Sequence, residues 1–154
     1  MVTRRLNMGL PCKPGPRWAL SLTMTKTNHD LARAYFAAVT AGELPDDLLT
    51  DDMTAWITTG GQMDKAAYQD VIRLLARMCK TPIRFTIDAI TAEDDRVVAE
   101  ARSTATLING EPYANTYVFC MRVRDGRIAH IAEHYNALVT EEKLIPLMTE
   151  MGAA

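Results

Sequence analysis

The sequence predicts a fold of the α+β class, in which helices precede a run of antiparallel strands. Two amphipathic helical patterns occupy the first half of the chain, at about 28–42 and 64–79. From residue 83 onward the apolar period changes to two, and four strand-like runs follow one another through short turns. Because most of these strands are joined directly, helices cannot cover both faces of the sheet that they form.

The composition is that of one ordinary globular domain. The chain has 154 residues, of which 48% are hydrophobic, and a formal net charge of −2. This is enough apolar material for a core. Basic residues form no stripe, so we expect no nucleic-acid partner. We also expect no membrane segment, because no apolar run approaches the about 20 residues that a spanning helix needs.

The cysteines predict a reduced, cytoplasmic protein. Cys12, Cys79 and Cys120 are odd in number and have no metal-ligand spacing. In apolar surroundings a free cysteine behaves as a small hydrophobic residue. The chain also shows no Gly-rich phosphate loop and no nucleophile elbow. We therefore expect neither a metal nor a cofactor.

The N-terminal segment differs from the rest of the chain. Residues 1–26 contain three prolines and several arginines with little periodicity, which predicts a flexible tail, and residues 27–154 then form the folded domain. The first helix is expected to begin near Asn28, because Thr27 and Asp30 resemble a capping box.

The remaining elements follow from local signals. Pro45 opens a short helical turn, and Asp64 is a good N-cap for the second helix. Thr140 is expected to cap a final short helix. The predicted strands are about 53–58, 83–90, 96–108, 111–124 and 127–135.

The strand from Tyr113 to Val123 is apolar on both faces. One face must meet the helices. The other is expected to meet a second copy of the chain, because a large exposed apolar patch usually marks an interface. The sequence therefore predicts a homodimer formed through the sheet.

Glu133 is the candidate catalytic residue. Side chains alternate between the faces of a strand, so Ile131, Glu133 and Tyr135 share one face of the last strand. A carboxylate in apolar surroundings has its pKa raised by desolvation, which suits it to acid or base chemistry near neutral pH. His130 and His134 face the other way, about 13 Å apart along the strand, too far for one metal ion.

Pairing of the strands across a turn at Asn109-Gly110 predicts the rest of the pocket. In this register the side chains of Ala99, Ala101, Ser103, Ala105 and Leu107 would face a partner sheet. A paired Arg102 would favour the charged form of either carboxylate, or neutralise both in a purely structural cluster. The expected cavity residues are Tyr35, Trp56, Glu100, Arg102, Asn115, Tyr117, Phe119, Glu133 and Tyr135.

Four segments carry a resemblance to a known superfamily: 34–42, 49–56, 113–119 and 124–135, the last with Arg-Asp-Gly-Arg-Ile and Ala-Glu-His-Tyr. They resemble the nuclear-transport-factor-2-like superfamily, and within it the SnoaL-like polyketide cyclase and ketosteroid isomerase branch. The resemblance implies a cone-shaped, curved mixed sheet wrapped on N-terminal helices, as in cystatin-like folds. It also implies a deep pocket and commonly a dimer.

The resemblance also implies roles for single residues. Tyr35 matches the first-helix tyrosine that assists the oxyanion in ketosteroid isomerases, while the two acids of those enzymes fall on Ile57 and near Phe119. Glu133 matches the last-strand acid of SnoaL-like cyclases and of limonene-epoxide-hydrolase-like enzymes. The charged pair of the latter corresponds to Glu100-Ala101-Arg102, in the opposite order.

Two classes of function follow. The first is a cofactor-independent isomerase, lyase or cyclase acting on a small, mostly apolar oxygenated substrate. Glu133 would move a proton while Arg102, Tyr35 and Asn115 steady negative charge. Epoxide-hydrolase-like activation of water is a variant of it. The second is a dimeric module that binds a small ligand without turnover.

Overall fold

The computed structural model describes the backbone of residues 19–152 and the side chains of residues 28–152. The prediction of a flexible tail falls largely on residues 1–18, which lie outside the described part. The expected helix start at Asn28 is wrong, because helix α1 (Ala19–Ala41) begins earlier. Residues 19–27 contain neither proline nor glycine. Helical hydrogen bonding therefore continues through the capping-box-like pair instead of beginning there.

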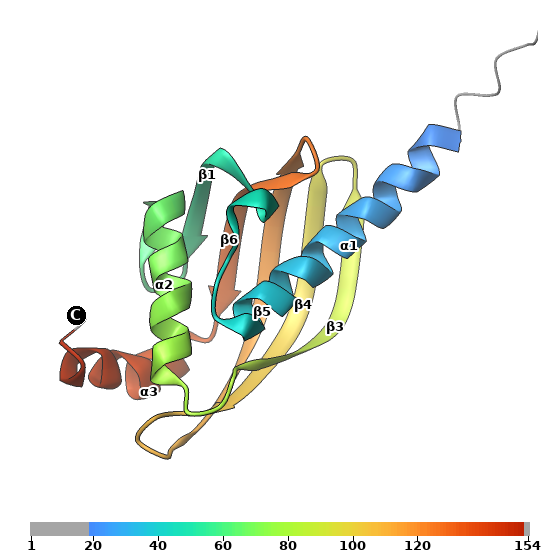
Figure 1. Cartoon of the computed structure of the whole chain (residues 1–154). Coiled ribbons are helices and arrows are strands. Elements are labelled where there is room, and N and C mark those ends of the chain that lie inside the picture. Colours follow the sequence, from blue (N-terminus) through green and yellow to red (C-terminus); the bar gives the residue numbers. More distant parts are fainter. Residues whose placement is uncertain (1–18, 153–154) are drawn as a thin grey trace, which may run out of the picture.

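A mixed six-stranded sheet forms the body of the protein, with strand order β2-β1-β6-β5-β4-β3 (Figure 1). β1 and β6 are parallel, and the other neighbours are antiparallel. The α+β prediction is confirmed. The elements after α1 are η1 (Asp46–Leu48), β1 (Leu49–Ile57), β2 (Gly61–Asp64), α2 (Lys65–Met78), β3 (Arg84–Glu93), β4 (Arg96–Thr106), β5 (Pro112–Arg124), β6 (Arg127–Tyr135) and α3 (Ala137–Glu150).

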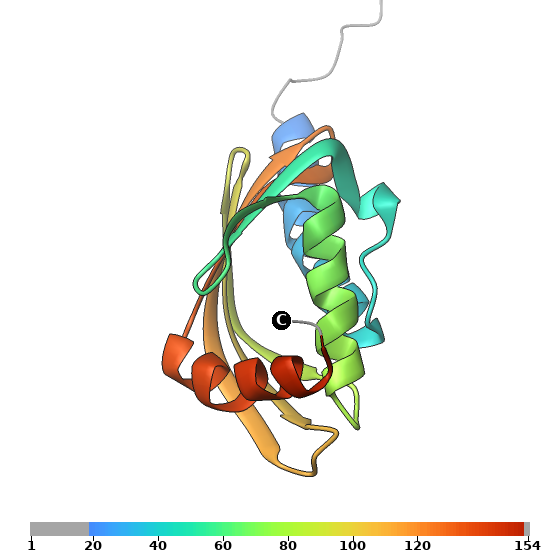
Figure 2. The same cartoon turned by 90° about the vertical axis from the view of Figure 1, so that its left-hand side faces the viewer.

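The sheet is strongly curved, and α1 and α2 lie on the same side of it (Figure 2). α1 contacts β3 and β4, α2 contacts β1, and α3 crosses one end where it contacts α2 and β5. α1 ends at Gly42, whose φ of +87° a residue with a side chain rarely adopts. A Cβ there would also lie 2.8 Å from the Ala76 side chain on α2. None of the helices in the described residues is long and apolar enough to span a bilayer.

The turn between β4 and β5 differs from the predicted two-residue turn. The loop holds three residues, 108–110: the Gly110 amide donates to the Leu107 carbonyl at 2.9 Å, and the Leu107 amide donates to Glu111. Gly110 has φ +86°, as expected for a three-residue hairpin that ends in a left-handed residue. The extra residue moves each partner by one, so Ala101 rather than Arg102 lies opposite Tyr117.

This change of register turns β4 over. Ala99, Ala101 and Ser103 are buried under the helices, whereas Glu100 and Arg102 lie on the outer face. The predicted positions of Glu100 and Arg102 in the cavity are therefore wrong, as is the prediction that the small residues of β4 face a partner sheet. Arg102 instead pairs with Asp88 on β3 at 2.7 Å.

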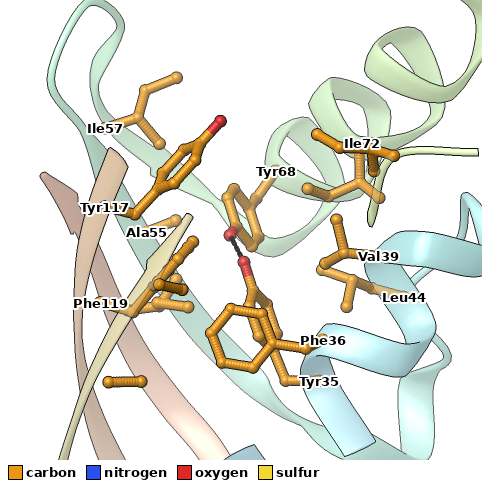
Figure 3. Packing of buried hydrophobic residues seen from close by; sticks show 14 of the residues in the cluster. Tyr35, Phe36, Val39, Leu44, Ala55, Ile57, Tyr68, Ile72, Tyr117 and Phe119 are labelled. Atoms are coloured by element: carbon orange, nitrogen blue, oxygen red, sulfur yellow. Dashed lines mark hydrogen bonds between the residues drawn. The ribbon is translucent and has the colours of Figure 1, made fainter. Parts of the chain in front are cut away.

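β5 has the predicted orientation, with Asn115, Tyr117, Phe119 and Met121 facing the helices. Phe119 lies at the centre of an aromatic cluster. Its ring makes an edge contact with Tyr35 and Phe36 of α1 and stacks on Tyr117, at centroid distances of 5.0–5.6 Å. Figure 3 shows these rings meeting between the sheet and α1. These packed rings lie next to the inward face of β6.

Candidate active site

Glu133 lies on β6, opposite Phe119 of β5 and beside Ile57 of β1. Both neighbours are buried apolar residues on the concave face. The alternation of β6 therefore directs the Glu133 carboxyl toward the helices, as the sequence predicts. The side chain is half-buried and forms no ion pair within residues 28–152.

Two buried tyrosines meet at this carboxyl. The hydroxyls of Tyr35 on α1 and Tyr68 on α2 are 2.6 Å apart. Tyr35 donates to Oε1 of Glu133 at 3.0 Å, and Tyr68 donates to the same oxygen. Figure 3 shows the two hydroxyls pointing at each other from their helices. Tyr35, Tyr68 and Glu133, here called the triad, join three segments that are far apart in sequence.

A count of protons constrains the state of the triad. Three short contacts join three oxygens, but the two tyrosine hydroxyls supply only two protons. All three contacts are hydrogen bonds only in the neutral acid: Oε1–H of Glu133 then donates to one tyrosine, that tyrosine donates to the other, and the other donates back to Oε1. The neutral carboxylic acid therefore completes the ring. In the ionised state, both hydroxyls are free to donate to the carboxylate.

The electrostatics agree with this count. Burial raises the pKa of Glu133, and the hydrogen bonds from Tyr68 and Tyr35 lower it by less. Burial and the charge of Glu133 raise the pKa of both tyrosines well above the usual value. The tyrosines therefore remain protonated donors across the neutral range, and Glu133 is the member that exchanges a proton.

A cavity of about 280 Å³ opens beside the triad. This is close to the lower end of the range for small-molecule pockets. Oε2 of Glu133 has no hydrogen-bond partner among residues 28–152, and Glu133 forms part of the wall. The wall is mostly apolar and consists of Ile57, Thr59, Gly60, Met63, Val71, Leu74, Leu75, Met78, Tyr113, Tyr117, Glu133, Tyr135, Thr140, Leu144, Ile145 and Met148.

Of the other predicted cavity residues, Tyr117 and Tyr135 line the wall. The Tyr135 hydroxyl lies 2.7 Å from the hydroxyl of Thr59 and so links β6 to the loop at the rim. Asn115 faces inward, but its side chain bonds the backbone amide and carbonyl of Asn136, which holds β5 to the start of α3. Phe119 lies in the aromatic cluster below the cavity.

Trp56 does not line the cavity, which corrects the prediction. Ala55 and Ile57 face inward on β1, so Trp56 between them faces outward. Its ring lies against His134, with centroids 5.0 Å apart. The alternation along β1, in which Met53, Ala55 and Ile57 are buried, distinguishes its two faces.

Tyr68 is the site residue that the sequence analysis missed. One apolar stripe of α2 contains Val71, Leu74 and Leu75, and these residues line the cavity. Tyr68 and Ile72 form a second stripe, turned toward α1, and are more deeply buried. Their i, i+4 spacing was a usable signal.

The pKa shift of Glu133 predicts a pH-dependent stability. Because the folded-state pKa is raised, the stabilisation is fully present below the unfolded value of about 4.3 and is lost as pH rises through the folded value. The difference in free energy of unfolding between wild type and Glu133→Gln should therefore change over this window in favour of the variant. Urea titrations from pH 4 to pH 9 measure it, and a constant difference would contradict the shift.

Comparison with known proteins agrees with this architecture. A SnoaL-like domain model matches residues 32–131, and no curated protein matches the sequence. A nuclear-transport-factor-2-like protein from Anabaena variabilis is 24% identical over 72% of this chain and 87% of its own, with a TM-score of 0.65. IdmH from Streptomyces antibioticus, a proposed polyketide cyclase, is 19% identical over 75% and 96%, with a TM-score of 0.65.

A proposed isomerase from Bacillus subtilis is 20% identical over 84% of this chain and 95% of its own, with a TM-score of 0.67. At these identities the similarity shows the fold. The family model covers well over half of the chain and includes α1 from Ala32, α2 and the first half of β6. The chain therefore belongs to the SnoaL-like domain family.

Proposed function

We propose that this protein is a cofactor-independent acid/base enzyme that moves a proton on a small, mostly apolar oxygenated substrate. One observation carries the proposal. The Glu133 carboxyl, whose pKa is raised, lines an apolar cavity, and one of its two oxygens accepts hydrogen bonds from two tyrosine hydroxyls. Groups that are shifted toward neutral pH in a cleft are typical of acid/base sites. Glu133 is the proposed catalytic residue, and Tyr35 and Tyr68 are positioning residues.

In the proposed reaction the ionised Glu133 takes a proton from a carbon next to a carbonyl group. The hydrogen bonds from Tyr35 and Tyr68 compensate for the desolvation of the carboxylate, so that it can form inside the cavity. Return of the proton to another carbon isomerises the substrate, while loss of a leaving group or attack of the carbanion on a second carbonyl gives a lyase or a cyclase. IdmH and the Bacillus subtilis protein are proposed to be enzymes of these types.

Two alternative functions have less support than the acid/base enzyme, and each has one observation that bears on it. Epoxide-hydrolase-like activation of water would need a charged pair at residues 100–102, and those side chains are on the outer face. A binding module without turnover is favoured by the mutual satisfaction of the triad, since a closed hydrogen-bonded ring is also a stable structural unit.

Exchange of carbon-bound hydrogen tests the proposal. The protein is incubated in deuterated buffer with small ketones, including acetophenone, cyclohexenone and indanone, and exchange next to the carbonyl is followed by NMR. We expect saturable exchange for at least one ketone, faster than in buffer alone. A ketone series that binds saturably without any acceleration would favour the binding module.

We also propose that the protein is a homodimer through the outer face of β1, β6 and β5, in the cytoplasm. Val118 is exposed there, next to Cys120 and the Trp56–His134 pair. In the described part of the chain α1 and α2 lie on the other side of the sheet (Figure 2). An apolar strip on a sheet face is typical of a subunit interface.

Val118→Asp should convert the dimer to a monomer, because it places two like charges in the apolar interface. Sedimentation equilibrium at micromolar concentration measures the change. Leu138→Asp is the matched control: Leu138 is also exposed and apolar but lies on α3. A wild-type chain that sediments as a monomer would refute the proposed interface.

A further inference from the structure

A second group of hydroxyls lies on the β5 wall of the cavity and has no part in the triad. Tyr113 and Tyr117 both line the cavity, and their hydroxyls are 2.9 Å apart. Ser103 on β4 donates to the Tyr117 hydroxyl at 3.1 Å. The Asn115 amide donates to the Tyr113 hydroxyl at 3.3 Å. All four side chains are buried in the protein, and the two tyrosines also face the cavity.

The hydrogen bonds of this group leave one proton over. The two tyrosine hydroxyls carry one proton each, and only one of these can lie in the contact between them. Ser103 and Asn115 bring further donors to the pair rather than acceptors. Whichever way the shared bond runs, the second tyrosine proton therefore has no acceptor within the group.

This proton needs an acceptor from the cavity that both tyrosines line, and a ligand oxygen there can accept it in place of water. Burial raises the pKa of both tyrosines, so the pair stays protonated and acts as a donor at neutral pH. Interactions with Tyr117, Asn115 and the nearby Thr140 hydroxyl lower the pKa of Tyr113, whereas the bond to Tyr113 raises the pKa of Tyr117. This pattern matches donation from Ser103 to Tyr117 to Tyr113.

The same cavity wall limits the charge of the ligand. The negative charge of Glu133 acts on the Tyr117 hydroxyl and raises its pKa, so the carboxylate and the hydroxyl pair influence the same space. No arginine or lysine lies among the residues of the wall. A ligand carboxylate would therefore meet repulsion without a counter-charge, whereas a neutral carbonyl oxygen would not.

We propose that Tyr113 and Tyr117 together form the donor site for a neutral carbonyl oxygen of the substrate, with one free proton shared between them. The proposed substrate class is accordingly a small apolar ketone or similar neutral carbonyl compound. The inference rests on the proposed function in one respect: Glu133 is taken to transfer the proton at the carbon next to this carbonyl group. Binding of the oxygen is a separate property and can be measured without turnover.

The test compares acetophenone with α-methylstyrene, which has the same shape but a methylene group in place of the oxygen. Dissociation constants are measured by NMR titration of the full chain. The dissociation constant of α-methylstyrene divided by that of acetophenone measures the preference for the carbonyl oxygen. This ratio should fall about tenfold in the Tyr113→Phe/Tyr117→Phe double variant, as expected for the loss of one hydrogen bond. The infrared carbonyl band of bound acetophenone should move to higher frequency at the same time.

Single variants give the sharper result. Tyr113→Phe leaves the Tyr117 proton free, and Tyr117→Phe leaves the Tyr113 proton free, so each should keep the ratio within about threefold of wild type. Tyr35→Phe, which alters the triad instead, should do the same. An unchanged ratio in the double variant, loss of the ratio in Tyr35→Phe, or a single variant as impaired as the double would each overturn the inference. So would the absence of saturable acetophenone binding to wild type.

If the double variant does not fold, tyrosine labelled with ¹³C at Cζ provides the readout in the wild-type chain. Acetophenone should then shift the Tyr113 and Tyr117 resonances and leave those of Tyr35 and Tyr68 in place, whereas the reverse pattern would contradict the site. Failure of the proposed function looks different. In that case Glu133→Gln would retain hydrogen exchange, while the binding ratio would still depend on the tyrosine pair.

Discussion

Glu133→Gln is expected to slow hydrogen exchange on a bound ketone by about 10²–10⁴-fold, the usual contribution of a positioned acid or base. Glutamine keeps an oxygen that can accept from Tyr35 and Tyr68, and it fits the same space between Ile57 and Phe119. It cannot take up a proton in the accessible pH range. The substitution therefore removes the chemistry while leaving the packing of the cavity largely intact.

The matched control is Glu100→Gln, the same substitution at an exposed residue on the outer face of β4. It should leave exchange within about twofold of wild type, since a surface charge away from the cavity is not involved in the reaction. Exchange rates at saturating ketone measure both variants, with circular dichroism as the check on folding. Unchanged exchange in Glu133→Gln would show that Glu133 is not the proton-transfer group.

Phe119→Ala is expected to have the largest effect on stability, a loss of about 3–5 kcal/mol in the free energy of unfolding. Phe119 is fully buried, and its ring contacts Tyr35, Phe36 and Tyr117. Truncation leaves a void that neither the sheet nor α1 can close without moving the triad. A loss of this size is a large share of the about 5–15 kcal/mol that stabilises an ordinary domain.

Val118→Ala provides the control for this variant, because Val118 is the next residue of the same strand and lies 38% exposed on the outer face. Its loss should be below about 1 kcal/mol in urea denaturation under dissociating conditions. If the two variants were equally destabilised, the assignment of the two faces of β5 would be wrong. The comparison therefore also tests the register on which the site depends.

The inward faces of β5 and β6 were predictable from the sequence because side chains alternate along each strand and the two strands pair, so an inward Glu133 on β6 places Tyr117 and Phe119 of β5 inward as well. Glu133 between Ile131 and Tyr135, and Tyr117 beside Phe119, could be placed inward on this basis alone. The α+β class followed from the change of apolar period near residue 83. Local pattern is sufficient for such features, because each strand or helix carries its own periodicity.

β4 could not be oriented in the same way. One face of this strand carries Ala99, Ala101 and Ser103, and the other carries Glu100 and Arg102. Which face is buried depended on a single residue in the turn at 108–110. A three-residue loop and a two-residue loop use the same Asn-Gly signal. Because the period of a strand is two, one residue was enough to move a predicted catalytic arginine to the opposite face of the sheet.

The acid itself, its strand and its apolar neighbours are properties of the sequence. Its tyrosine partners are not, because Tyr35, Tyr68 and Glu133 come from two helices and a strand whose contacts form only when the helices dock on the curved sheet. The same holds for the bond from Ser103 to Tyr117, which depends on how β4 and β5 align. Periodicity determines which face a side chain takes, whereas the distance between groups on different elements is set by tertiary packing alone.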